Sequence, residues 1–302
     1  MLNHIHDILQ TAKTTQRGVI AVAAAHDEDV LRAVTAAHEA GMVDAILVGD
    51  TGKIADILAS LGKSAADFTL RSAADDVECA RVAVKAVRDG EASFLMKGLL
   101  GTADLMRAVI DKETGLRTDK LISHVMLYEV DSYPKMLALT DGGMNTFPDV
   151  VKKADILENA AGVLKALGYT AINAACICGA EVVNPKIQST VDAAELSGMQ
   201  DRWAPYNMNV FGPVALDLAI SRTSCAHKHY DAPGAGDADI LLVPTYEVGN
   251  GIGKAMTYFA AGRSAGIIVG AKVPIVLVSR ADSADSKLAS IALGKLIAAN
   301  MA

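Results

Sequence analysis

Short apolar runs alternate with longer amphipathic stretches along most of the chain. Residues 18–25 read GVIAVAAA, which is typical of a buried strand, and residues 27–40 then carry apolar side chains at the three- and four-residue spacing of a helix face. The same alternation predicts further strands over residues 44–49, 92–96, 170–177, 239–243 and 274–278, and further helices over residues 54–61, 76–88, 102–111, 254–265 and 285–299.

Strands and helices that alternate in this way form βαβ units with parallel strands, so we expect an α/β fold with helices on both faces of each sheet. Residues 121–139 differ from this order of strands and helices, because apolar and polar residues alternate one by one around Tyr133-Pro134. This pattern favours antiparallel strands at a domain junction. We therefore predict two α/β/α sandwich domains with mostly parallel sheets. The first comprises residues 1–135 plus 284–302, and the second comprises residues 136–283.

Composition narrows the function classes. A length of 302 residues suits about two domains, and a content of 51% hydrophobic and 21% charged residues is globular rather than disordered. A net charge of −7 and an aromatic content of 4% argue against nucleic-acid binding. No apolar run approaches the roughly 20 residues that span a bilayer, and residues 1–10 are too polar for an export signal. Four cysteines do not make a disulfide framework, so we expect a cytoplasmic protein.

Candidate chemistry lies where predicted strands end, because ligands of α/β folds bind beyond the carboxyl ends of strands, near helix N-termini. Lys97 ends one strand, Thr102 is expected to cap the helix that follows, and Arg107 lies in that helix. Lys97 and Arg107 can both face a ligand in this arrangement. The alternative is an ordinary capped helix with solvated charges.

A second strand end leads into a glycine-rich segment, Gly249-Asn250-Gly251-Ile252-Gly253. Three glycines in five residues let a backbone approach a ligand closely. The following Lys254 gives a partial likeness to a P-loop, but Val248 and Ala255 stand where that motif needs Gly and Ser/Thr. The sequence therefore gives little support to a nucleoside-triphosphate site, and a flexible surface turn is the alternative.

The third strand end carries Ser279-Arg280, directly after the apolar run 274–278. Ser283 can cap the next helix, and the guanidinium of Arg280 is a permanently charged fork that suits phosphate. A helix N-terminus and a guanidinium together make an anion site. An ordinary helix start with a surface arginine is the alternative.

Two cysteine-containing patterns are weaker. Cys225, His227 and His229 are spaced two apart and have no second ligand cluster, so we predict no metal. Cys176 and Cys178 would share one face of a strand and are expected in the core, since no sequence feature supplies a base partner.

Taken together, these segments resemble the phosphate acetyltransferase and phosphate butyryltransferase family. The likeness spans about 190 residues in the family's order, and its most specific part runs from Val243 to Arg280. The chain length and residues 121–149 look more like the butyryl branch. The pieces that match are Lys97–Arg107, Gly212-Pro213 with Asp217 and Ala219, Pro244–Asn250, and Gly270 through Pro274 to Ser279-Arg280.

The resemblance implies reversible transfer of a short-chain acyl group between coenzyme A and inorganic phosphate. It implies no metal, no covalent enzyme intermediate and no resident cofactor, with coenzyme A as a substrate. It also implies an active site in an interdomain cleft and a homodimer or larger homo-oligomer. The partners it implies are acyl-CoA, phosphate and acyl phosphate.

By the same resemblance, Ser279 and Arg280 match the family's catalytic pair, and Arg107 matches an anion-binding arginine. The family's acidic base falls on Ser286 here. The nearest acid is Asp285, which we take as the candidate base, and Asp282 is the other choice. The candidate substrate-binding residues are Lys97, Thr102, Arg107, Gly249, Asn250 and Gly251.

These residue types suit the chemistry. A thiol with a pKa of about 8.5 is mostly protonated near neutral pH, so a carboxylate beside the coenzyme A sulfur can accept its proton during attack on the acyl carbonyl. Ser279 and backbone N–H groups can stabilise the oxyanion, and Arg280 can neutralise the leaving phosphate.

Two other functions stay open from the residues. One is a non-catalytic acyl-CoA or phosphate sensor, because the acid is displaced relative to Ser279-Arg280. The other is a nicotinamide-dependent decarboxylating dehydrogenase on a related fold, although no G-x-G-x-x-G follows an early strand.

Overall fold

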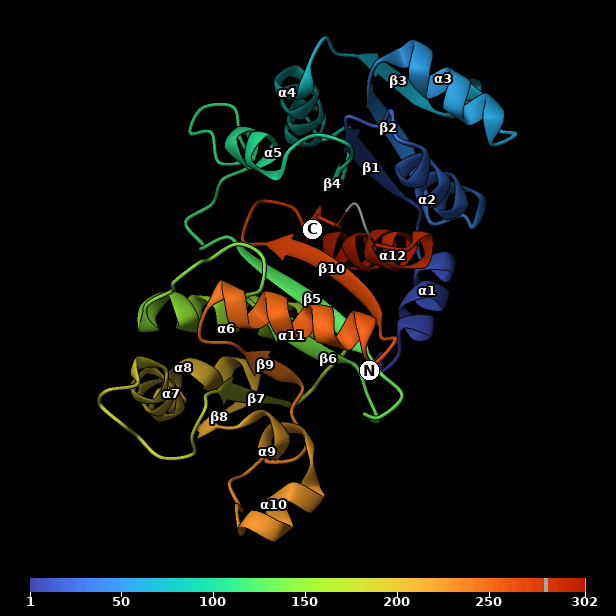
Figure 1. The fold of residues 1–302 in the computed structure, drawn as a ribbon. Helices are drawn as coiled ribbons and strands as arrows, with labels where there is room; N and C mark the ends of the chain where they lie inside the picture. The colour runs from blue at the N-terminus through green and yellow to red at the C-terminus, as the bar shows by residue number, and fades with distance from the viewer. Residues whose placement is uncertain (280–281, 302) are drawn as a thin grey trace. The chain divides into compact units, whose positions relative to one another are not determined.

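The computed structural model describes residues 1–279 and 282–301, which form two compact units. We call the first the central unit, made of Met1–Ile5 and Leu121–Ser264, and the second the terminal unit, made of His6–Lys120 and Ala265–Ala302. Each unit combines β-strands with surrounding helices (Figure 1). The predicted α/β class with mostly parallel strands is confirmed.

The terminal unit contains strands in the order β3-β2-β1-β4-β11-β10. The first five run parallel to one another, and β10 is antiparallel to β11. Its strands are β1 (Gly18–Ala23), β2 (Val43–Gly49), β3 (Thr69–Ser72), β4 (Phe94–Lys97), β10 (Arg263–Val269) and β11 (Ile275–Val276). Its helices are α1 (Ile5–Thr14), α2 (Glu28–Glu39), α3 (Thr51–Ser60), α4 (Asp76–Arg88), α5 (Thr102–Val109) and α12 (Ala284–Met301).

Aspartate caps fix where several of these helices begin. The carboxylates of Asp27, Asp50 and Asp75 each accept a hydrogen bond from a backbone N–H in the first turn of α2, α3 and α4. Gly62 follows α3 with a φ of +71°, the left-handed conformation that glycine adopts without strain. These local signals explain why the helices predicted over residues 27–40, 54–61 and 76–88 are confirmed within a few residues.

Helices cover both faces of the terminal unit's strands (Figure 1). Helix α4 packs on β1, β2 and β4 and contacts α5, whereas α12 packs on α2 and on β4 and β11. Helix α12 is buried along most of its length, from Lys287 to Ala298. No helix among the described residues combines the length and the apolar character that crossing a membrane requires.

The central unit contains strands in the order β5-β6-β9-β7-β8. Strands β5 and β6 are antiparallel, as residues 121–139 predicted, and the others are parallel. The strands are β5 (Ser123–Glu129), β6 (Leu137–Thr140), β7 (Ile172–Ile177), β8 (Met208–Val214) and β9 (Ile240–Leu242). The helices are α6 (Val150–Ala166), α7 (Gln188–Gly198), α8 (Gln200–Trp203), α9 (Leu216–Ile220), α10 (Arg222–Lys228) and α11 (Tyr246–Tyr258).

Alternate residues of the central strands face two different helix layers. Ala175 and Leu241 belong to an apolar cluster that packs against Ile252 and Met256 of α11. Their neighbours Cys176 and Leu242 point to the opposite face, where they meet Lys153 of α6 and residues of α7. The buried core of this unit therefore lies on both sides of its strands.

Three sequence expectations differ from the structure near the C-terminal end. The helix expected over residues 254–265 is α11, which begins at Tyr246 and ends at Tyr258, and residues 263–269 form β10 instead. The strand expected over residues 274–278 is shorter, only Ile275–Val276. Residues 265–279, which the sequence grouped with the second domain, pack in the terminal unit because β11 pairs with β4.

Candidate active site

A pocket of about 160 Å³ lies in the terminal unit at the carboxyl ends of parallel strands. Lys97 and Gly98 come from the end of β4, and Ser279 comes from the chain just after β11. Further polar lining comes from Asp27 and Asp29 at the start of α2 and from Lys287 of α12. Ligands of α/β folds bind at this edge, so the pocket is the candidate active site.

Backbone packing beside β1 shapes one wall of this pocket. Gly98 N donates to Ala23 O at 2.8 Å, and Leu99 N donates to Ala24 O at 2.9 Å. A Cβ atom at position 98 would lie only 2.2 Å from Ala24 O, so the close approach of these two chain segments requires glycine. The turn after β4 is thereby held against the end of β1.

Two local contacts involve the described residues on either side of the start of α12. Ser279 N donates to Asp282 Oδ2 at 2.7 Å. Ser283 Oγ accepts from Ser286 N at 3.1 Å, which confirms the expected cap of this helix. One oxygen of the Asp282 carboxylate is therefore already engaged by the backbone N–H of Ser279. Arg280, the guanidinium predicted to bind phosphate, lies outside the described residues.

Asp285, the candidate base, lies exposed in the first turn of α12 and does not line the pocket. Two acids that the sequence did not single out, Asp27 and Asp29, do line it. Asp27 caps α2 by accepting from Val30 N at 3.0 Å, so part of its carboxylate is engaged.

Two buried lysines line the pocket, and the sequence singled out only one of them. Lys97 is 7% exposed and donates to the carbonyl oxygens of Gly98 and Leu100, each at 3.1 Å. Lys287 is 2% exposed and donates to Asp282 O at 2.6 Å. Lys287 precedes the buried residues Ser290 and Ile291 by three and four positions, and this spacing is the signal that could have placed it on the buried face of its helix.

The other two candidates near β4 do not line this pocket. Gly101, not Thr102, is the N-cap of α5, and it makes no side-chain cap bond. Thr102 is instead the first helical residue and is exposed. Arg107 is 71% exposed and pairs with Asp104 at 2.8 Å. The expected cap at Thr102 is therefore wrong, because the glycine before it already has the extended conformation of an N-cap.

The glycine-rich candidates Gly249, Asn250 and Gly251 lie in the central unit, inside helix α11 rather than in a loop. Thr245 caps this helix, and its Oγ1 accepts from Val248 N at 3.5 Å. Gly249 is buried, and a Cβ atom on it would lie 2.7 Å from Gly142 Cα. Its lack of a side chain is thus explained by packing. Gly251 has open space around it.

The segment that contacts Gly249 follows β6 and is organised by one buried carboxylate. Asp141 is 2% exposed and accepts hydrogen bonds from the backbone N–H groups of His124, Gly143, Met144 and Asn145. These bonds fold the segment into a tight turn whose backbone reaches α11. Asp141 therefore positions this end of the central unit's strands.

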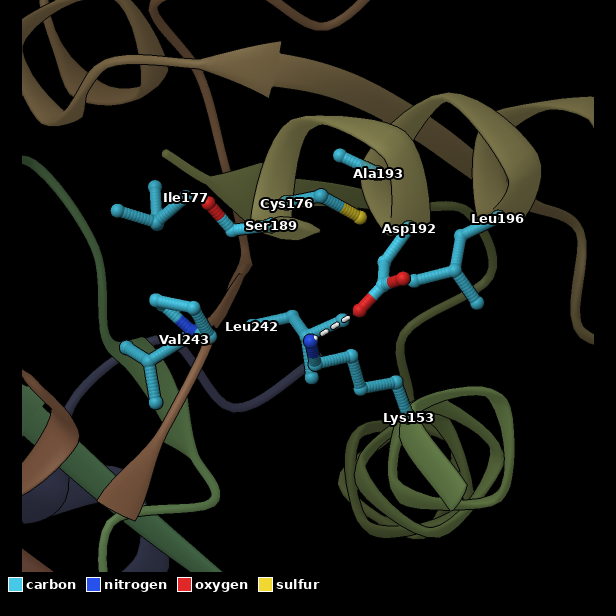
Figure 2. Close-up of a pocket in the computed structure, with 10 residues that line it drawn as sticks. Lys153, Cys176, Ile177, Ser189, Asp192, Ala193, Leu196, Leu242 and Val243 are labelled. Atoms are coloured by element: carbon cyan, nitrogen blue, oxygen red, sulfur yellow. Dashed lines mark hydrogen bonds and ion pairs between the residues drawn. The ribbon is translucent and has the colours of Figure 1, made fainter. Parts of the chain in front are cut away.

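A second, much smaller cavity in the central unit holds a buried ion pair (Figure 2). Lys153 Nζ and Asp192 Oδ2 point toward one another at 2.6 Å, and each side chain is 7% exposed. The cavity volume is about 10 Å³, which is room for about one water molecule. Its surroundings are those of a structural salt bridge rather than a substrate site.

Cys176 and Cys178 are buried, as expected. All four cysteines are free and buried. Burial raises the pKa of the thiols of Cys176 and Cys178, so both stay protonated near neutral pH and are poor nucleophiles. Cys225 donates to Leu218 O at 3.2 Å. Within the described residues, no three His, Cys, Asp or Glu side chains gather to hold a metal ion.

Comparison with known proteins gives a consistent result. The family model described as phosphate acetyl/butaryl transferase matches residues 63–294. The phosphate butyryltransferase of Clostridium acetobutylicum is 42% identical over 300 residues, which cover 99% of this chain and 100% of that protein. The phosphate acetyltransferase of Thermotoga maritima is 38% identical over 92% of this chain and 95% of its own length.

A solved structure agrees with these sequence matches. The branched-chain phosphotransacylase from Enterococcus faecalis V583 superimposes with a TM-score of 0.82 and 33% identity, over 93% of this chain and 98% of that one. The match extends through both units, including the segments that supply Lys97 and Ser279. The chain therefore belongs to the phosphate acetyl/butaryl transferase family.

Proposed function

We propose that this protein catalyses the reversible transfer of a short-chain acyl group, butyryl, branched-chain or acetyl, between coenzyme A and inorganic phosphate. The observation that carries the proposal is the 42% identity, over nearly the whole chain, to a phosphate butyryltransferase. The pocket at the carboxyl ends of β1, β4 and β11 supports it, because this pocket offers buried cations beside Ser279. Buried cations and a hydroxyl donor are groups that bind an anionic substrate.

The reaction needs no covalent intermediate on the protein. When acyl-CoA reacts, a phosphate oxygen attacks the thioester carbonyl carbon, a C–O bond forms, and the C–S bond breaks to release coenzyme A as a thiolate that then takes a proton. In the reverse direction the thiolate attacks the acyl phosphate, and phosphate leaves. Ser279 is assigned to the developing oxyanion, where fixed donors are worth about 100-fold or more in rate. Arg280 is assigned to the phosphate.

Proton transfer to and from the sulfur needs a base, for which Asp285 remains our candidate. Asp282 is less available, because its carboxylate already accepts from Ser279 N. The further substrate-binding residues we propose are Lys97, Thr102, Arg107, Gly249, Asn250 and Gly251. We also propose a cytoplasmic homodimer or larger homo-oligomer without a resident cofactor, and four free, buried cysteines are compatible with a reducing compartment.

The test is a thiol-release assay with acyl-CoA substrates of two to five carbons. We expect release of free thiol that depends on added phosphate, with equal amounts of acyl phosphate formed. Arg280→Ala should fold normally and lose about 100-fold or more in turnover. Absence of phosphate-dependent release with every substrate would overturn the proposal, and tight coenzyme A binding in that case would favour a sensor.

A further inference from the structure

The candidate pocket contains two ammonium groups that are almost completely withdrawn from solvent. Lys97 comes from the end of β4 and is 7% exposed, and Lys287 comes from α12 and is 2% exposed. Burying a charged ammonium is strongly unfavourable unless an opposite charge or hydrogen bonds compensate the lost hydration. Two such groups in the lining of one cavity therefore need an explanation.

Lys287 is held in place and still has donors to offer. An ammonium has three N–H groups. Within residues 1–279 and 282–301, the hydrogen-bond acceptor of Lys287 Nζ is Asp282 O, at 2.6 Å. The carbonyl fixes the side chain at the pocket wall and leaves two N–H groups available there.

The acidic groups nearby offset the charge of this wall only weakly. Asp29 Oδ2 lies 4.0 Å from Lys287 Nζ, beyond hydrogen-bond distance, and the Asp29 side chain is 64% exposed. The Asp27 carboxylate accepts from the backbone of α2. The buried part of the lining is therefore cationic, whereas the carboxylate nearest Lys287 is largely in solvent.

We propose that Lys287, together with Lys97, binds a phosphoryl oxyanion in this pocket. The inference rests on the proposed function and adds to it a binding residue for the phosphate substrate that lies outside the Ser279-Arg280 pair. An ammonium is a compact point charge that suits phosphate oxygens, and a cavity of about 160 Å³ has room for one such group. Coenzyme A carries phosphates too. Ser279, which we assign to the reaction centre, lines the same pocket, so we take the substrate phosphate as its occupant.

Steady-state kinetics of Lys287→Met distinguish the two sources of phosphate. We expect the KM for inorganic phosphate to rise about 10-fold or more, because a hydrogen bond to a charged group is lost, and the KM for acyl-CoA to change less than about 2-fold. The matched control is Lys295→Met. Lys295 is equally buried in the same helix, but its ammonium donates to the carbonyl oxygens of Ala12 and Thr15, away from the pocket. This control should keep the phosphate KM of the wild type.

A binding measurement separates failure of the site from failure of the proposed function. Inorganic phosphate should raise the unfolding temperature of the wild type more than chloride at equal ionic strength, and at the same phosphate concentration this difference should be clearly smaller in Lys287→Met. Phosphate binding without turnover would remove the proposed function and leave the anion site intact. Turnover with an unchanged phosphate KM in Lys287→Met, or a rise confined to the KM for acyl-CoA, would overturn the inference.

An exposed position provides a variant that does not depend on the folding of Lys287→Met. Asp29→Asn removes the carboxylate nearest to Lys287, so we expect the phosphate KM to fall about 2- to 5-fold at low salt. High salt should reduce this effect, because exposed charges are screened. A phosphate KM that does not respond to Asp29→Asn at low salt would also overturn the inference.

Discussion

At the scale of single residues, the central unit depends on the buried pair of Lys153 and Asp192. Each side chain is 7% exposed, and the Asp192 carboxylate also accepts from Gln188 Nε2 at 2.7 Å. Removing one partner leaves the other charge buried without compensation, which costs about 3–5 kcal/mol. We expect Lys153→Met to lower the free energy of unfolding by about this amount in urea denaturation.

The control for this prediction is the double variant Lys153→Met/Asp192→Leu. It replaces both charges by apolar side chains of similar size, so most of the lost stability should return. If Lys153→Met were as stable as the wild type, Asp192 would not be left with an uncompensated buried charge, and this explanation of the pair would be wrong. It would also be wrong if the double variant were no more stable than Lys153→Met alone.

Residues at strand ends could be located from the sequence, and residues inside helices could not. Lys97 and Ser279 follow apolar runs, and the pocket contains both. Lys287 was missed because a lysine in a predicted helix is usually on its solvated face. Asp285 is the acid nearest in sequence to the position that the family resemblance indicates, yet its side chain lies exposed. Side-chain direction on a helix depends on tertiary packing, which the order of residues encodes only weakly.

At the scale of elements, helix α11 shows the same limit. The sequence placed its start after the glycines, since glycine has the lowest helix propensity after proline. The helix instead begins at Tyr246, because Thr245 caps it and because small residues allow close approach to neighbouring segments. Helix α4 was located correctly over residues 76–88, because its cap at Asp75 and its apolar spacing agree.

This explanation predicts opposite effects for two glycines of α11. Gly251→Ala should raise the free energy of unfolding by up to about 1 kcal/mol, because the site is open and alanine favours helix. Gly249→Ala should lower it by about 1–3 kcal/mol, because the new methyl group would meet Gly142 Cα at 2.7 Å and Val243 Cγ2 at 2.8 Å. Thermal and urea denaturation measure both.

The two variants control for one another, since they make the same change two residues apart in one helix. Equal effects on stability would contradict the packing explanation of Gly249. Because Gly251 is also a proposed substrate-binding residue, the value of kcat/KM for Gly251→Ala reports on binding separately from stability. A more stable protein with reduced kcat/KM would support a role in binding.

At the scale of the whole molecule, the chain enters the terminal unit twice. Residues 6–120 supply β1 to β4, and residues 265–302 return to add β11 beside β4 and α12 over α2. The alternation of strands and helices predicts the class of the fold. It does not predict that β11 pairs with β4, because local patterns do not say which strands pair. The grouping of residues 265–283 with the second domain followed chain order alone.

A chain that ends at Ser264 tests how far the terminal unit depends on its second part. Without β11, the edge of β4 loses its backbone hydrogen-bond partner. Without α12, the apolar surfaces that its buried residues from Ile291 to Ala298 now cover become exposed to water. We expect the amides of β1 and β4 to exchange hydrogen rapidly in this chain. The amides of β7 and β9, whose strands are paired within residues 121–264, should stay protected and serve as the internal control. Protection of β1 and β4 equal to that in the full chain would contradict the argument, because residues 6–120 would then form a stable unit by themselves.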